Sequence, residues 1–372
     1  MDTQVAIVGG GLAGLHAARL LQAAAIGFVL IEARDRFGGR IFTADETGSP
    51  CGDGFDLGPS WYWPQVQPAI GELVAELGLP AFGQNSEGDV VFERMSREGR
   101  HRYRGYAQEQ QSMRLVGGTA SLVHALARDL PRERIWLGAR VTALTLAGNA
   151  AALTISRTDG TREILTAAQV IAALPPRLLD ATVAFTPVQD AATTRRWRDA
   201  ATWMAPHAKF FALYDRPFWR AAGLSGTAQS MVGPMMEMHD ATTASGRAAL
   251  FGFLGVAADQ RAALGEGALT RACLDQFARI FGEQARAPTA TIFKDWAADP
   301  LTATVADMAA AAGHAGTGDA PWVTGPWQRR LVMAGSETSP FESGYLAGAV
   351  IAARRAVDQV LAALGSDRDA GQ

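Results

Sequence analysis

The first forty residues alternate between short apolar runs and a glycine-rich turn. Continuous apolar runs predict buried strands over residues 5–8 and 28–31, and an amphipathic pattern predicts a helix over residues 15–25. The segment Gly9-Gly10-Gly11-Leu12-Ala13-Gly14 joins the first strand to this helix. Strand, glycine turn, helix and strand in this order predict an α/β unit that binds a dinucleotide.

The pattern changes further along the chain. We predict two polar, arginine-rich strands over residues 90–94 and 101–104. Apolar, β-branched and aromatic residues predict strands over residues 208–214, 227–232, 235–239 and 250–256, and a further strand follows at residues 289–296. Helical patterns occupy residues 66–78, 120–130, 258–264, 267–282 and 345–364. No internal repeat is visible. The pattern therefore predicts a large α/β body to which an α+β part has been added.

Length and charge narrow the possible partners. The 372 residues fit two or three domains or one large body. The net charge of −3 lacks the concentrated positive field that nucleic acids and anionic membranes require, so neither is an expected partner. No apolar run reaches the ~18 residues of a membrane span, and an apolar strand takes the place of a signal peptide. We expect a cytoplasmic protein.

The two cysteines, Cys51 and Cys273, are too few for a disulfide framework. They also lack the paired spacings of a zinc or iron–sulfur site. We therefore expect no metal centre and a reducing compartment.

Each glycine of the first turn has a distinct physical purpose. Gly9 permits the tight turn, Gly11 lets a pyrophosphate approach the backbone, and Gly14 lets the helix pack closely on the strand. The helix N-terminus presents N–H groups to the phosphates. Glu32 ends the second strand, where a carboxylate can accept hydrogen bonds from an adenosine ribose.

The glycine turn and Glu32 alone do not show whether the dinucleotide carries nicotinamide or flavin. The next segment of the sequence distinguishes the two cofactors. Arg34 is followed by the glycine pair Gly38-Gly39 and by Arg40. Here the sequence resembles the flavin-containing amine oxidase family, in which this segment grips FAD. A wider group, with phytoene desaturases and protoporphyrinogen oxidase, shares the segment, so it favours FAD more strongly than amine oxidation.

Further stretches extend the resemblance over most of the chain. The loop with Gly58, Pro59 and Ser60 is similar to the family's loop beside the isoalloxazine ring, and Val141 lies where the family's backbone pairs with adenine. The closing motif resembles the family's last segment and implies further FAD-binding positions at Gly335, Glu337, Gly344, Tyr345 and Leu346. A helix that starts there directs its N–H groups toward the flavin. The resemblance implies noncovalent FAD, because Val305 stands where some relatives carry the cysteine that bonds the flavin.

The resemblance also sets the expected domain organisation. We predict a Rossmann-like FAD-binding domain formed by residues 1–78, 115–197 and 298–372. An interleaved α+β substrate domain takes residues 79–114 and 198–297. The first insertion is much shorter than in the larger amine oxidases, so the funnel over the flavin is expected to be open or completed by a second subunit, as in a homodimer.

Lys209 is the leading catalytic candidate. It interrupts an apolar strand, where burial lowers a lysine pKa, and its surroundings resemble the family strand whose lysine holds the water at flavin N5. We expect His207 to be a structural histidine with its hydrogen bonds satisfied. The other lysine, Lys294, is expected to be exposed.

The monoamine oxidases guide the substrate nitrogen between two aromatic rings. Tyr345 takes the position of one ring, whereas Ala306 stands at the position of the other. The sequence therefore supplies only one of the two rings of this aromatic cage. Trp61 or Trp63 in the substrate pocket could supply the missing surface, and surface tryptophans packed on helices are the alternative.

Related amino-acid oxidases carry an arginine where this chain has Ser60-Trp61, which argues against a simple α-amino-acid substrate. Arg94 or Arg97 could replace it from another direction. The leading hypothesis is an FAD-dependent oxidase of an amine C–N bond that transfers hydride to flavin N5, with O₂ or another electron acceptor. The alternatives are a C–C desaturase or porphyrinogen-type oxidase and a non-catalytic flavoprotein scaffold.

Overall fold

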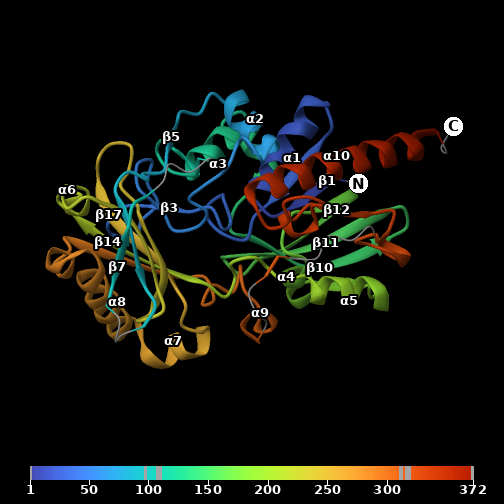
Figure 1. Cartoon of the computed structure of the whole chain (residues 1–372). Coiled ribbons are helices and arrows are strands. Elements are labelled where there is room, and N and C mark those ends of the chain that lie inside the picture. The colour runs from blue at the N-terminus through green and yellow to red at the C-terminus, as the bar shows by residue number, and fades with distance from the viewer. Residues whose placement is uncertain (1, 96–98, 106–110, 310–312, 315–319, 370–372) are drawn as a thin grey trace.

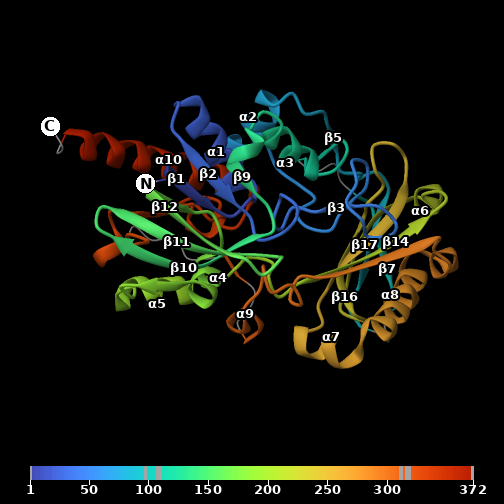
Figure 2. The same ribbon diagram turned by 180° about the vertical axis from the view of Figure 1, so that it is seen from behind.

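The computed structural model describes residues 2–95, 99–105, 111–309, 313–314 and 320–369. Two large sheets organise these residues, one at each end of the molecule (Figure 1). The helices α1 and α10 lie together over the first sheet, and α7 and α8 cover the second at the far end. The view from behind gives the same arrangement (Figure 2).

The first sheet is centred on the strand that the apolar pattern predicts near the N-terminus. Strand β1 (Thr3–Val8) lies between β12 (Arg162–Ala172) and β2 (Phe28–Ile31) and is parallel to both. The remaining strands are β9 (Ile135–Trp136), β10 (Ala139–Ala147), β11 (Ala150–Arg157), β13 (Ala184–Thr186) and β19 (Leu331–Met333). Buried on both faces, β1 needs no polar alternation, which explains its continuous apolar run.

Helices cover both faces of this sheet. On one face, α1 (Leu12–Ala23) packs on α10 (Leu346–Asp369) around Leu15, Leu21 and Val350. The helices α2 (Pro68–Glu76) and α3 (Ala120–Ala127) extend this layer. On the other face lie α4 (Pro176–Thr182) and α5 (Ala191–Asp199). This layering confirms the predicted α/β architecture.

The second sheet has seven strands. In spatial order they are β18 (Ala290–Asp295), β14 (Ala208–Tyr214), β17 (Ala248–Leu254), β16 (Met235–Asp240), β15 (Leu224–Ser230), β6 (Asp89–Glu93) and β7 (His101–Tyr103). One face packs on α8 (Glu266–Phe281) through Phe210, Met238 and Phe277. The helices α6 (Phe218–Ala221) and α7 (Ala258–Leu264) adjoin it. The other face carries Phe211 and Phe251, which pack on Phe55 from the N-terminal part of the chain.

Small elements complete the described residues. Two-stranded ribbons pair β3 (Thr43–Ala44) with β4 (Phe55–Asp56) and β5 (Ala81–Gly83) with β8 (Met113–Leu115). The helix α9 (Val305–Ala309) is short, as are the 3₁₀ turns Arg132–Arg134, Glu283–Arg286, Gly325–Trp327 and Ser336–Thr338. Among the helices of the described residues, none has the length and apolarity to cross a bilayer.

The register of the second sheet brings functional side chains into one row. Lys209 on β14 lies opposite Lys294 on β18 and opposite Phe253 on β17, and Glu237 on β16 lies on the far side of Phe253. Directly paired residues of antiparallel strands project from the same face. The sheet therefore places a lysine, an aromatic ring and a carboxylate side by side.

The predicted element types agree with the structure, and the boundaries shift where capping decides them. The first helix begins at Leu12 instead of residue 15, because extended Gly11 serves as its N-cap and Gly14 is taken into the helix. The helix predicted from residue 66 starts at Pro68, a residue suited to a first helical turn. The domain boundaries themselves stay a prediction.

Gly14 is the tightest point of contact between α1 and the turn before it. A Cβ there would lie 1.9 Å from the carbonyl oxygen of Gly9, so Gly14→Ala should displace the helix and cost about 1–3 kcal/mol or more. A Cβ added at Gly365 in α10 would meet no atom of the described residues within 4 Å, and Gly365→Ala should be neutral or stabilise by up to ~1 kcal/mol. Thermal unfolding of both variants tests the difference, and equal melting temperatures would contradict it.

Candidate functional site

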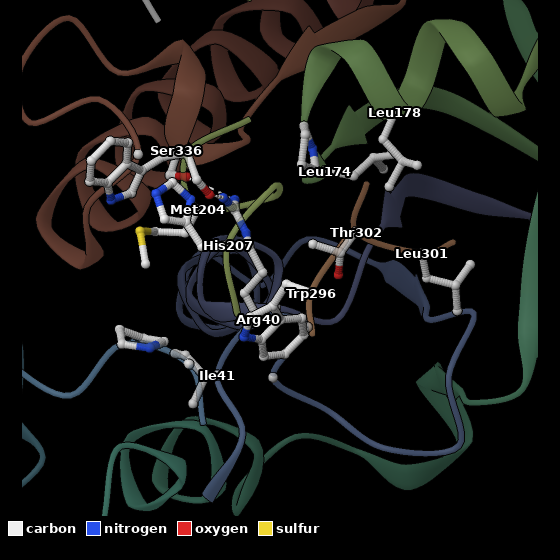
Figure 3. Close-up of a pocket in the computed structure, with 18 of the residues that line it drawn as sticks. Arg40, Ile41, Leu174, Leu178, Met204, His207, Trp296, Leu301, Thr302 and Ser336 are labelled. Carbon is white, nitrogen blue, oxygen red and sulfur yellow. Dashed lines mark hydrogen bonds between the residues drawn. The ribbon is translucent and has the colours of Figure 1, made fainter. Parts of the chain in front are cut away.

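A cavity of about 860 Å³ lies between the two sheets. Its size falls in the range of small-molecule and cofactor sites. Of the site residues predicted from the sequence, all line this cavity except Gly14 and Glu337. Gly14 lies in the helix–turn contact described above, and Glu337 lies behind Arg40. Figure 3 shows part of the wall, with Arg40, Met204 and His207 on one side and Leu174 and Leu178 on another.

One end of the cavity is built by the glycine turn and the end of β2. Gly9 has φ +108°, and a Cβ there would lie 2.7 Å from the carbonyl oxygen of Ala173, so only glycine fits. The Glu32 carboxylate accepts hydrogen bonds from the backbone N–H groups of Gly10 at 2.6 Å and Arg34 at 2.8 Å. These bonds hold the carboxylate at the tip of β2, on the cavity wall.

Gly11 and Gly39 form an open cradle beside it. The nearest atom to a Cβ at either position is backbone 3.7 Å away, and neither position meets a side chain within 4 Å. The backbone of both residues therefore stays accessible from the cavity. Gly38 and Gly39 adopt positive φ, +105° and +57°, which keeps this second turn close to the first.

The two arginines of this segment are held by carboxylates. Arg34 donates to both oxygens of Asp299, at 2.9 and 3.0 Å. Arg40 donates to Ser336 at 3.1 Å (Figure 3). It also donates to Glu337 at 2.7 Å and to the Trp203 carbonyl oxygen. Both arginines line the cavity, so their charges border it while the ion pairs fix their geometry.

The amino group of Lys209 is enclosed by the loop that follows β4. Its Nζ donates to the carbonyl oxygens of Gly58 at 2.6 Å and Asp56 at 3.1 Å, and lies 2.9 Å from Ser60 Oγ. The residue is 3% exposed, and burial lowers the pKa of the amine to about 7; Asp56 opposes this shift and Arg114 adds to it. At neutral pH both forms of the amine are accessible.

The expectations for the neighbouring Lys294 and His207 are wrong. Lys294 is half-buried, with Nζ 4.3 Å from the Trp296 ring centre and 3.6 Å from Asp299, because the register sets it beside Lys209. Burial lowers its pKa. His207 lines the cavity, and its Nδ1 is buried without a hydrogen-bond partner among the described residues. Burial, with Arg261 nearby, lowers the pKa of this histidine.

Aromatic rings gather around Tyr345, and one of them belongs to Trp63, which the sequence analysis offered for the missing surface. Val305 is 88% exposed and Ala306 is also exposed, so α9 turns both positions away from the cavity. Trp203 lies 6.3 Å from the Tyr345 ring, and Trp63 lies at the same distance edge-on. Gly344 makes the Trp203 approach possible, because a Cβ at Gly344 would lie 2.6 Å from Trp203 Cβ.

Trp61 belongs to a separate group on the second sheet. Its ring lies 4.7 Å from His239 and 6.3 Å from Phe253, and its Nε1 donates to Gln84. Both candidate tryptophans thus lie on the cavity wall and not on the outer surface. Arg94 is exposed and does not line the cavity, and Arg97 lies outside the described residues.

Several wall residues were missed at the sequence level: Trp203, Met204, Met236, Glu237, Phe253 and Arg261. A usable signal existed for Glu237, since strict alternation along β16 puts Glu237 and His239 on the face opposite Met238. Trp203 lacked such a signal, because it lies in an irregular turn.

The comparisons with known proteins agree with this geometry. The family profile described as flavin containing amine oxidoreductase matches residues 96–361, and an NAD(P)-binding Rossmann-like domain matches residues 7–77. The chain belongs to the flavin-containing amine oxidase family. It is therefore an FAD-dependent oxidoreductase, as the glycine and arginine motifs predicted.

Individual relatives differ in how much they share. AofH of Mycobacterium tuberculosis, named as a flavin-containing monoamine oxidase, is 25% identical over 465 aligned positions that cover 97% of each chain. Polyamine oxidase 2 of Arabidopsis thaliana is 34% identical over 90 residues, 24% of this chain and 18% of its own. The structure of a putrescine oxidase bound to putrescine has a TM-score of 0.81 at 22% identity, covering 97% of this chain and 99% of that one. This last similarity shows a common fold.

The cavity wall fits FAD. The open glycine cradle, the carboxylate of Glu32 and the start of α10 at Leu346 line one continuous cavity. They supply a close backbone approach, an acceptor for ribose hydroxyls and a positive helix end.

Loss of the Glu32 carboxylate should weaken FAD binding. Glu32→Ala removes a charge-assisted acceptor and should cost about 1–3 kcal/mol, a ~5- to 150-fold rise in Kd. Titration of the FAD-free protein, followed by flavin fluorescence, measures the effect. Glu72→Ala on α2, where 66% of the side chain is exposed, is the control. Equal affinities in the two variants would remove Glu32 from the cofactor site.

Proposed function

We propose that the protein is an FAD-dependent oxidase of an amine C–N bond. The product is an imine that hydrolyses to an aldehyde or ketone, and O₂ is reduced to H₂O₂. Bound FAD supplies the hydride acceptor. The observation that carries the proposal is the buried amino group of Lys209, which lines the same cavity as the FAD motifs and the ring of Tyr345.

The chain's own residues have distinct roles in this proposal. Lys209 and Tyr345 are the catalytic residues: Lys209 faces the reacting end of the flavin, and the Tyr345 ring flanks the substrate nitrogen. Gly58, Pro59 and Ser60 form part of the cavity wall, and Gly58 and Ser60 contact Lys209. The cofactor is held without a covalent bond, since neither Cys51 nor Cys273 lines the cavity.

The alternatives have less support. A C–C desaturase or porphyrinogen-type oxidase handles apolar substrates and gains nothing from a buried, titrating lysine in its cavity. A non-catalytic scaffold does not fit a chain of an oxidoreductase family. The possible homodimer and the absence of nucleic-acid and membrane partners stay predictions.

Lys209→Met tests the assignment of the reacting end. Methionine keeps the apolar stem and removes the polar head, so FAD content should be retained. The rate of flavin reduction by amine, or of reoxidation by O₂, should fall by about one to three orders of magnitude, or ~1.4–4 kcal/mol. Stopped-flow absorbance of the flavin separates the two half-reactions.

The control is Lys294→Arg, which keeps the charge beside Asp299. Lys294 is the other lysine of the chain and does not line the cavity, so both half-reactions should keep their rates. If Lys209→Met behaves like the parent while Lys294→Arg fails, the reacting end has been misplaced. If both behave like the parent, the amine-oxidase proposal loses its main catalytic residue.

The charges on the wall favour an amine with a second cationic group. Two acidic residues, Glu32 and Glu237, line the cavity among the described residues, and Glu32 belongs to the nucleotide end. Glu237 lies two strands from Lys209, about 10 Å at the usual strand spacing. A hydrogen bond to His239 lowers the Glu237 pKa, so the group is a carboxylate at neutral pH. We propose a diamine class of substrate, consistent with the similarity to the putrescine oxidase fold.

Glu237→Gln should discriminate between amines. Loss of the carboxylate should lower kcat/KM for putrescine about 10- to 100-fold, because the distal ammonium loses a charge-assisted partner, and should leave butylamine nearly unchanged. Steady-state kinetics with both amines measure the split. Glu283→Gln, with 77% of the side chain exposed, is the matched control. An equal loss for the two amines would exclude a distal-cation site at Glu237.

A further inference from the structure

We propose that Ser60 and Lys209 form a proton-accepting pair that takes the proton from the ammonium group of the incoming substrate. The inference rests on the proposed amine oxidation, because hydride transfer requires the neutral amine and most alkylamines arrive protonated. It assigns a task to the Ser60 hydroxyl, and it makes Lys209 a proton acceptor toward the cavity.

The partners of Lys209 have unequal capacities. The carbonyl oxygens of Gly58 and Asp56, 2.6 and 3.1 Å from Nζ, can only accept hydrogen bonds. The Ser60 hydroxyl, 2.9 Å from Nζ, can either accept or donate. Ser60 is therefore the one partner of the three that can reverse its hydrogen bond.

This set of partners satisfies both protonation states. An ammonium has three donors, which match two carbonyls and the Ser60 oxygen. A neutral amine has two donors and a lone pair, which match the two carbonyls and the Ser60 O–H. Burying an unpaired polar group is costly. Because this site leaves no polar group unpaired in either state, Lys209 can be buried both as the ammonium and as the neutral amine. When Lys209 is charged, the Ser60 O–H is free to turn toward the Asp56 carbonyl oxygen at 3.4 Å.

The charged groups around the pair shift the pKa of Lys209 in opposite directions. Burial lowers the pKa of Lys209 to about 7, Arg114 lowers it further, and Asp56 raises it. On the sheet, Lys294 lies on the neighbouring strand and Glu237 lies beyond Phe253. The ring centres of Phe251, Phe253 and Phe211 lie 4.7, 5.0 and 5.9 Å from Nζ.

The proton transfer balances without any other reactant. Ser60 Oγ takes a proton from the substrate ammonium while the Ser60 hydroxyl proton passes to Lys209 Nζ. One N–H bond of the substrate breaks, one N–H bond forms on Lys209, and Ser60 ends with its own O–H restored. No electrons change hands, and the substrate is left as the neutral amine. Because Ser60 and Lys209 both line the cavity, the transfer needs no opening of the protein.

The chain's lysine content permits a direct test of the pair. With only Lys209 and Lys294 present, [ε-¹³C]lysine labelling gives two NMR signals, and Lys294→Arg assigns them. The FAD-loaded and FAD-free proteins are both titrated. Lys209 should titrate near pH 7. In Ser60→Ala its midpoint should fall by at least one pH unit, since the charged form loses an acceptor that it needs more than the neutral form does.

Two further variants separate this effect from a change of structure. Ser60→Thr keeps a hydroxyl and should restore most of the shift. Ser121→Ala removes a partly buried serine that donates to a carbonyl away from the cavity, and should leave the Lys209 midpoint unchanged. An unchanged midpoint in Ser60→Ala, or a parent midpoint near 10, would overturn the pair.

Anaerobic stopped-flow reduction links the pair to the reaction. A lowered pKa means that the proton-accepting form predominates above pH 7, so the reduction rate should rise as pH rises through 7. In Ser60→Ala this rise should move to lower pH with the NMR midpoint, and the rate at high pH should fall about tenfold, equivalent to ~1.4 kcal/mol. A profile that stays in place while the midpoint moves would overturn the relay. If no amine reduces the flavin at any pH, the proposed function fails, whereas the NMR titration still reports on the pair.

Discussion

The burial of one amine holds the two halves of the site together. Lys209 projects from the second sheet, and its hydrogen-bond partners come from the end of β4 and the loop after it, in the N-terminal part of the chain. A buried ammonium without partners costs several kcal/mol, so the sheet and the loop must keep this relative position. Trp296 from the adjoining strand segment fixes the same loop through its Nε1, 2.9 Å from the Leu57 carbonyl oxygen. The cavity between them follows from these contacts.

Ion pairs fix the positions of other residues on the cavity wall. Arg34 joins the segment of the second glycine turn to Asp299, and Arg40 joins the same segment to Glu337 near the C-terminus. Arg261, 3% exposed, holds Asp295 and the Pro206 carbonyl oxygen at the start of the Lys209 strand. Removing one member of a buried pair leaves an uncompensated charge, so these contacts fix geometry more than they add net stability. Such rigidity suits a site that has to hold a cofactor and a substrate in a fixed relative orientation.

Local patterns were sufficient for the dinucleotide half of the site. Gly9, Gly11 and Glu32 belong to one short strand–turn–helix–strand unit, so their spacing in the sequence fixes their spacing in space. Lys209 could be found because a lysine in an apolar strand is unusual. The resemblance failed to place Val305 and Ala306 at the cavity, because both lie beyond the turn that follows β18, and α9 exposes both.

The α/β class, the FAD motif and the lysine that reaches the cavity could be predicted from the amino-acid sequence, because they depend on periodicity and on contacts between near neighbours in the chain. The residues that surround this lysine could not, because they come from distant segments that meet only in the folded chain. The antiparallel register placed Lys294 beside Lys209 and Glu237 beyond Phe253. The tertiary structure also brings Trp203 to Tyr345 from a distant part of the chain. The approach is possible because Gly344 has no side chain that would collide with Trp203. Pairing between distant strands depends on the free energy of the whole packed core, which no local pattern contains.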